Sequence, residues 1–171
     1  MQTTWVRSGG LAALVAGLLR AVNSFIPGTT ARVELLYLAT DLALLLALIG
    51  LARWLPKPAG RWGRYPFWAA FAGIGILIVR DLAPGWAALY PPGALLLAGG
   101  LCWLAVAHWH DRAVPRWILA FWLLSTLIGV VGFFTPGLTL LFVVAGVLFG
   151  LSFIGIGLRM ILLARNDPDV A

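Results

Sequence analysis

Three side chains that could do chemistry, Glu34, Tyr37 and Asp41, lie inside the apolar segment "RVELLYLATDLALLLALIG" (32–50). Their spacing of three and then four residues places them on one face of a helix. An isolated ionised acid is costly in apolar surroundings, so each acid must be neutral, paired or in contact with water. We therefore expect this face to point into the interior of the protein.

The segment before it offers a cation to this face. Arg20 and Asn23 are three residues apart, and a reversal of the chain around Gly28 brings Arg20 level with position 36. A bidentate pair between an arginine and a carboxylate is favourable at low dielectric. The sequence predicts one inward polar cluster, a candidate ligand-binding site, formed by Arg20, Asn23, Glu34, Tyr37 and Asp41.

The composition of the chain identifies the surroundings of this cluster as a membrane. Of 171 residues, 62% are hydrophobic and 11% are charged, and the mean hydropathy is +0.99, far from the balance of a soluble domain. A bilayer core about 30 Å thick needs about 20 apolar residues per helix, so the chain has room for about six spans. We predict an all-α, polytopic integral membrane protein with a single transmembrane domain over residues 1–171.

Turn residues separate six apolar segments. All ten prolines lie between or at the edges of these segments. The tight-turn pairs are Pro27-Gly28, Pro84-Gly85, Pro92-Gly93 and Pro136-Gly137, because proline presets one backbone angle and glycine permits the reversal. The segments predict membrane helices at about 9–26, 33–54, 66–83, 90–109, 114–134 and 138–163.

The distribution of basic residues predicts the orientation. Positive charge in short loops marks the cytoplasmic side of a membrane. Only Arg32 and Arg80 lie on one predicted side, and nine bases lie on the other: Arg7, Arg53, Lys57, Arg61, Arg64, Arg112, Arg116, Arg159 and Arg165. We expect a bacterial cytoplasmic membrane protein with both termini cytoplasmic.

The basic connection between the second and third segments carries Arg53, Lys57, Arg61 and Arg64. We interpret these four residues as a topology and anchoring signal, with a lipid-headgroup or partner site as the alternative. Because the net charge of +6 is assigned to loops in this way, no nucleic-acid partner is expected.

With this orientation, the polar cluster lies in the outer half of the membrane. Arg80 and Asp81 add an outer charged pair at the end of the third segment. An intramembrane ionisable residue suggests function, such as proton relay, ligand binding or ion coordination. The alternative is a structural clamp between the first two helices, in which Arg20 neutralises one acid and the other acid stays protonated.

The remaining reactive side chains indicate no catalytic or metal site. Cys102 is the single cysteine, and His108 and His110 point to different faces of a helix, so neither a zinc site nor a redox site is predicted. Glu34 and Asp41 are the only candidate pair of catalytic acids, and about 10 Å of helix rise separates them. We expect no cofactor, and we do not expect an enzyme.

The last segment contains a pair of small residues, Gly146 and Gly150, four positions apart. Such pairs let two membrane helices approach closely. We interpret this pair as a helix-packing site, with a subunit contact as the alternative.

In length, number of spans and cytoplasmic termini, the chain is similar to the substrate-binding subunits of energy-coupling-factor vitamin transporters, which bind a small molecule in an outward-facing pocket. The similarity is architectural, because the chain contains no motif of that group. Two hypotheses for function follow. The first is a binding or transport component with a small-molecule ligand at the polar cluster. The second is a structural or interaction subunit of a membrane complex, with partner subunits and the lipid bilayer as its contacts.

Overall fold

The computed structural model describes residues 2–26, 30–55, 64–110, 114–135 and 137–166. The described residues are almost entirely helical. They form the α-helices α1 (Gln2–Asn23), α2 (Ala31–Trp54), α3 (Tyr65–Leu82), α4 (Tyr90–Ala107), α5 (Arg116–Phe134) and α6 (Thr139–Asn166), and the short 3-10 helix η2 (Pro84–Leu89) between α3 and α4.

Six of these helices are long and apolar enough to cross a membrane, with mean hydropathies of 1.3 to 2.5 over their most apolar windows. This confirms the predicted all-α fold and makes the chain a multi-pass membrane protein. Large apolar side chains such as Leu11, Leu46 and Leu127 are more than half exposed on the outside of the bundle. An apolar exterior is what a lipid-facing surface requires.

The first helix differs most from its predicted bounds, because α1 begins at Gln2 rather than near residue 9. Its first turns are held by neighbouring helices. Val6 is buried, Arg7 Nη2 donates a hydrogen bond to the Ala164 carbonyl oxygen of α6 at 3.1 Å, and the Arg53 guanidinium of α2 lies 4.8 Å from the centre of the Trp5 ring. Contacts with α2 and α6 therefore extend α1 toward the N-terminus, through polar residues that the hydrophobic pattern did not include in the first membrane helix.

The connection between α3 and α4 also differs from the expectation. Pro84 and Gly85 lie in η2, at the predicted turn. Gly93, however, is buried within the first turn of α4, where proline is tolerated because the first N–H groups of a helix have no intrahelical partner. The pair Pro92-Gly93 therefore opens a helix and does not form a turn.

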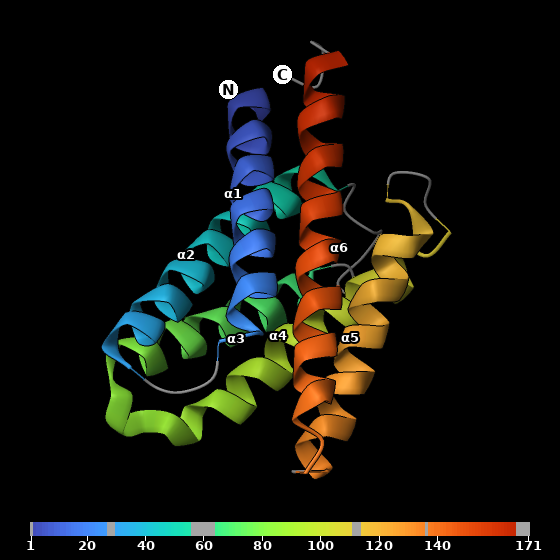
Figure 1. Ribbon diagram of the computed structural model, residues 1–171. Coiled ribbons are helices and arrows are strands. Elements are labelled where there is room, and N and C mark those ends of the chain that lie inside the picture. The colour runs from blue at the N-terminus through green and yellow to red at the C-terminus, as the bar shows by residue number, and fades with distance from the viewer. Residues whose placement is uncertain (1, 27–29, 56–63, 111–113, 136, 167–171) are drawn as a thin grey trace.

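The α-helices pack as a ring in which α1 lies between α2 and α6, and α3, α4 and α5 close the ring between them. Helix α1 packs along α6 on one side and α2 on the other, α5 packs on α6, and α3 packs on α4. In Figure 1, α1, α5 and α6 run along one direction and α2, α3 and α4 are inclined to them, with both termini at the same end. The buried core between them includes Leu48, Ile74, Leu104, Trp122 and Phe153.

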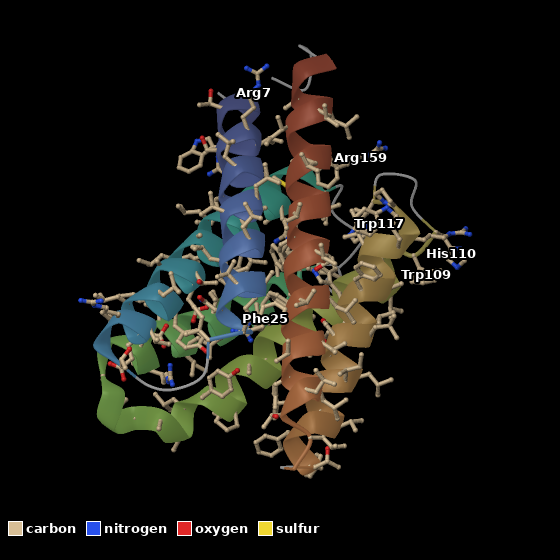
Figure 2. The ribbon with its side chains drawn as sticks, viewed as in Figure 1. Arg7, Phe25, Trp109, His110, Trp117 and Arg159 are labelled. Atoms are coloured by element: carbon tan, nitrogen blue, oxygen red, sulfur yellow. The ribbon has the colours of Figure 1, made fainter. Side chains whose placement is uncertain are left out.

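Several of the basic residues that predicted the orientation lie toward the end of the bundle where α1 begins and α6 ends. Figure 2 shows Arg7 and Arg159 toward this end, and Phe25 at the opposite end of α1. Arg53 and Arg64, from the basic connection, have exposed side chains at the end of α2 and just before α3. Lys57, Arg61, Arg112 and the turn residues Pro27, Gly28 and Pro136 lie outside the described residues.

Candidate functional site

Polar side chains converge near the ends of α1 and α3, the start of α4 and the first half of α2. We call this group the polar cluster. Because successive helices run in opposite directions, residues far apart in the chain reach the same depth here. The members are Arg20 and Asn23 from α1, Tyr37, Thr40 and Asp41 from α2, Arg80 and Asp81 from α3, and Tyr90 from α4.

One ion pair anchors the α3 side of the polar cluster. Arg80 Nη1 donates to Asp81 Oδ1 at 2.6 Å, and the side chain of Asp81 is 2% exposed while that of Arg80 is 23% exposed. The Arg80 guanidinium also lies 5.5 Å from the centre of the Tyr90 ring. Asp81 Oδ2 is buried and receives no hydrogen bond from any described residue.

Asp41 lies beside this ion pair. Its neighbours are Arg20, Arg80 and Asp81, and the carboxyl groups of Asp41 and Asp81 are within hydrogen-bonding range of each other. Asp41 is 7% exposed. The outer charged pair and the acidic face of α2 were separate groups in the sequence interpretation, and the fold brings them together.

Arg20 is half-buried between helices. Its polar neighbours are Tyr90, Asp41 and Tyr37, and its guanidinium lies 6.0 Å from the centre of the Phe149 ring of α6. The expected bidentate pair with an acid of α2 is not formed within the described part of the chain. The cation is instead shared between a tyrosine hydroxyl, an aromatic face and a nearby carboxyl group, and Asp81 takes Arg80 as its ion-pair partner.

A hydrogen-bonded pair joins α1 to α2 within the polar cluster. Asn23 Nδ2 donates to Thr40 Oγ1 at 3.0 Å, and Thr40 Oγ1 donates to the Leu36 carbonyl oxygen at 2.7 Å. Asn23 is 3% exposed. Its Oδ1 atom receives no hydrogen bond from the residues that the structure describes.

Glu34 stands apart from the other residues predicted for this site. Its side chain is half-buried near the start of α2 and makes no hydrogen bond or ion pair among the described residues. The sequence interpretation did not include Thr40 or Tyr90. The signals available for them were the adjacency of Thr40 to Asp41, and the turn at Pro84-Gly85, which returns Tyr90 to the depth of Arg80.

The other predicted group, Gly146 and Gly150, lies against α1. A Cβ atom on Gly150 would lie 2.5 Å from the Gly17 carbonyl oxygen, and one on Gly146 would overlap the Ser24 hydroxyl. A third contact joins the two helices, since a Cβ atom on Gly157 would lie 2.6 Å from the Gly10 carbonyl oxygen. The two backbones approach so closely that larger side chains do not fit. We call these residues the glycine contact.

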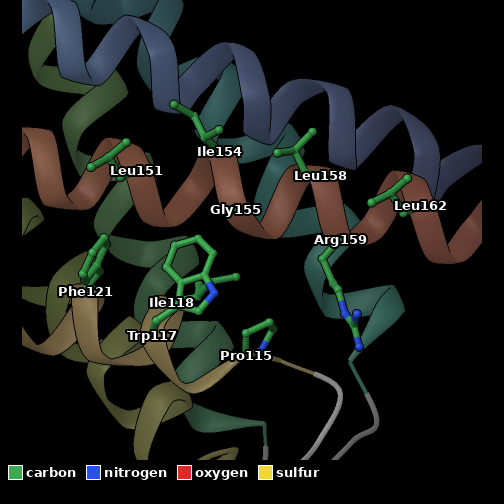
Figure 3. A pocket seen from close by; sticks show the side chains of 10 residues that line it. All are labelled: Pro115, Trp117, Ile118, Phe121, Leu151, Ile154, Gly155, Leu158, Arg159 and Leu162. Atoms are coloured by element: carbon green, nitrogen blue, oxygen red, sulfur yellow. The ribbon is translucent and has the colours of Figure 1, made fainter.

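An apolar groove of about 330 Å³ lies between α5 and α6 (Figure 3). Trp117 and Phe121 line it from α5, and Leu151, Leu158 and Arg159 line it from α6. It faces outward, away from the polar cluster. His108 is buried and His110 is exposed, and the described residues contain no group of three or more His, Cys, Asp or Glu side chains placed to hold a metal ion.

The chain matches no family model, no curated protein and no solved structure. Its function must therefore be argued from the geometry of its own residues. Within the membrane-spanning helices, the polar cluster is where charged and hydrogen-bonding side chains from different helices meet.

Proposed function

We propose that this multi-pass membrane protein is a binding or transport component whose site is the polar cluster. Both termini are taken to be cytoplasmic on the distribution of basic residues, which places the cluster in the outer half of the membrane. The observation that carries the proposal is a pair of buried acceptors in the cluster, Asn23 Oδ1 and Asp81 Oδ2, that receive no hydrogen bond from the described residues.

Unpaired buried acceptors argue against a purely structural role. A clamp between helices is stable when its polar atoms satisfy one another, and each buried acceptor left unpaired costs about 1–3 kcal/mol. The polar cluster leaves two such atoms although Arg20, Tyr37 and Tyr90 stand close by as donors. A few convergent polar groups with unused hydrogen-bonding capacity are what a site for a polar ligand requires.

Part of the polar cluster lies at the surface of the bundle. Arg20 and Tyr37 are half-buried, and Tyr90 is 40% exposed. Asp41 and Asp81 lie behind them with little exposure. A polar solute that reaches Tyr37 from the outer surface would therefore meet the cation first and the acids next.

The alternative, a structural subunit that assembles through α6, loses its main support. The small residues proposed as a partner surface, Gly146 and Gly150, contact Ser24 and Gly17 within the same chain. That face of α6 is covered by α1 and is not available to another subunit.

Cysteine labelling tests this proposal. In a Cys102→Ser background, Tyr37→Cys should react with a membrane-impermeant maleimide that is added outside intact cells, because water reaches the polar cluster. Leu46→Cys on the same helix is a matched control, since Leu46 is 52% exposed but faces lipid, where a thiol does not ionise and reacts poorly.

The labelling pattern of the two cysteine variants distinguishes a hydrated cluster from a dry one. Equal labelling of Tyr37→Cys and Leu46→Cys would mean that exposure alone governs the reaction. No labelling at Tyr37→Cys from either side of the membrane would show a dry cluster and overturn the proposal. Labelling only after permeabilisation would place the cluster on the cytoplasmic side and overturn the orientation.

A further inference from the structure

Asp41 and Asp81 come from different helices and face each other across the polar cluster. Their carboxyl groups are within hydrogen-bonding range, and both side chains are buried, at 7% exposure for Asp41 and 2% for the side chain of Asp81. Two ionised carboxylates are both acceptors and cannot donate to each other. A hydrogen bond between them requires that one of them carries a proton.

The contacts of Asp81 determine which oxygen would receive that hydrogen bond. Asp81 Oδ1 accepts from Arg80 Nη1 at 2.6 Å, so Asp81 has its counter-ion. Asp81 Oδ2 is buried and has no donor among the described residues. A protonated Asp41 supplies the missing donor, and Asp81 then has a partner on each oxygen.

We propose that Asp41 and Asp81 together bind one exchangeable proton, with Asp41 as the group that takes it up and Asp81 as its acceptor. The proposal deepens the proposed function, on which it rests for the polar cluster being a binding site, by naming the proton as an ion that the site takes. Uptake of a proton from water converts the Asp41 carboxylate to a carboxylic acid that donates to Asp81 Oδ2. Release returns the proton to water.

The charged groups around the pair give Asp41 a different partner in each state. Arg20 faces Asp41 from α1, Tyr37 lies on the same helix, Arg80 comes from α3, and Tyr90 contacts the cations from α4. When ionised, Asp41 is attracted to Arg20 and repelled by Asp81. When protonated, it hydrogen-bonds Asp81 and leaves Arg20 with Tyr90 and Phe149. Proton binding therefore exchanges a contact with α1 for a contact with α3.

Infrared spectroscopy of the full chain, reconstituted in lipid and labelled with ¹³C at the aspartate carboxyl groups, tests the proposal directly. At neutral pH we expect the carbonyl stretch of one protonated aspartic acid. This band should be lost in Asp41→Asn, which is isosteric and retains a donor toward Asp81. It should also be lost in Asp81→Asn, because the negative charge that opposes ionisation of Asp41 is removed and Asp41 then ionises beside Arg20. Glu34→Gln is the control and should retain the band.

Each outcome bears on the proposal. A band that is lost in Asp41→Asn but kept in Asp81→Asn would show that Asp41 holds the proton alone, and the absence of the band from the unaltered protein would show that both acids are ionised. Either result overturns the shared proton. If Asp81→Asn does not fold, Arg80→Leu/Asp81→Leu removes the acid with its counter-ion and should lose the band in the same way.

The spectrum is independent of the labelling experiment, so the two proposals can fail separately. If Tyr37→Cys is labelled but no aspartic acid band is seen, the proposed binding site stands and the shared proton does not. If the band is seen but Tyr37→Cys is not labelled, the two acids share a proton in a cluster that water does not reach.

Discussion

Helix α1 makes two contacts of opposite character. On α6 it meets the glycine contact, where Gly17 and Gly150 bring two backbones together. Toward α2 and α3 it presents Arg20 and Asn23 to the polar cluster. In the contact with α6, the small size of the glycine residues decides the packing. In the polar cluster, buried hydrogen-bond acceptors remain without donors among the described residues.

If the proposed function holds, the difference between these contacts separates the residues that hold the bundle together from the residues that bind. Between helices in lipid, close van der Waals packing supplies association because the surrounding chains are as apolar as the side chains. The glycine contact can therefore hold α1 in place without help from charges. The polar cluster is then free to keep incomplete hydrogen bonding, which a site that exchanges a ligand or a proton requires.

The largest expected effect lies at the glycine contact. A Cβ atom on Gly150 would lie 2.5 Å from a backbone oxygen, which cannot move as a flexible side chain does. We expect Gly150→Leu to destabilise the protein by more than the roughly 3 kcal/mol that marks the upper part of the usual overpacking range. Thermal unfolding in detergent measures the loss.

A matched control exists in α4. A Cβ atom on Gly99 meets nothing within 4 Å, so Gly99→Leu should leave the unfolding temperature nearly unchanged. If Gly150→Leu were as well tolerated as Gly99→Leu, the close approach of α1 and α6 would not exist in the protein.

The next effect concerns the ion pair of the polar cluster. Arg80→Leu leaves Asp81 buried without its counter-ion, and we expect a loss of about 3 kcal/mol. Adding Asp81→Leu should recover much of this loss, because apolar groups then replace the pair. A double-mutant cycle on thermal stability measures the coupling.

Arg20 provides the comparison for this cycle. It forms no ion pair within the described residues and is half-buried, so Arg20→Leu should cost less than Arg80→Leu. Additive losses for Arg80 and Asp81, or a larger loss for Arg20→Leu, would mean that Arg20 is the main counter-ion of the cluster.

A smaller effect is expected for the hydrogen bond between α1 and α2. Thr40→Val removes the acceptor of Asn23 Nδ2 and leaves a buried donor unpaired, which costs about 1–3 kcal/mol. Thr135→Val is the control, since the Thr135 hydroxyl donates to the Val131 carbonyl oxygen in the last turn of its own helix, at 2.6 Å. Equal unfolding temperatures for the two variants would show that Asn23 does not depend on Thr40.

Hydrophobic patterning was sufficient to predict six helices, because a span of about 20 apolar residues has few alternatives in a bilayer. It placed the ends less well where a contact decides them. The start of α1 depends on Arg7 reaching Ala164 and on Trp5 reaching Arg53, and these partners are more than 40 residues away in the chain. Local sequence does not reveal such contacts.

The same limit applies to the polar cluster. Helical spacing predicted that Tyr37 and Asp41 share a face, and antiparallel neighbours placed Arg20 close to them. Which cation pairs with which acid depends on how α3 and α4 are inclined against α2, and spacing within one helix carries no information about this. The sequence therefore assigned Arg80 and Asp81 to a separate pair, whereas the fold places Asp81 beside Asp41.

The smallest expected effect on stability is for replacement of Glu34, and it tests whether helical spacing alone identifies the members of the polar cluster. Helical spacing placed Glu34 on the same face as Asp41, and we predicted from the sequence that both belong to one inward polar cluster. In the structure, the Glu34 side chain is half-buried and makes no hydrogen bond or ion pair among the described residues.

We therefore expect Glu34→Leu to change the free energy of unfolding by no more than about 0.5 kcal/mol, as is usual for a substitution away from specific contacts. Asp41→Leu should cost about 1–3 kcal/mol, because it removes the proton that we propose Asp41 donates to the buried Asp81 Oδ2. Thermal unfolding of the two variants side by side measures the difference. A loss at Glu34 as large as that at Asp41 would place both acids in the polar cluster and restore the interpretation that helical spacing gave.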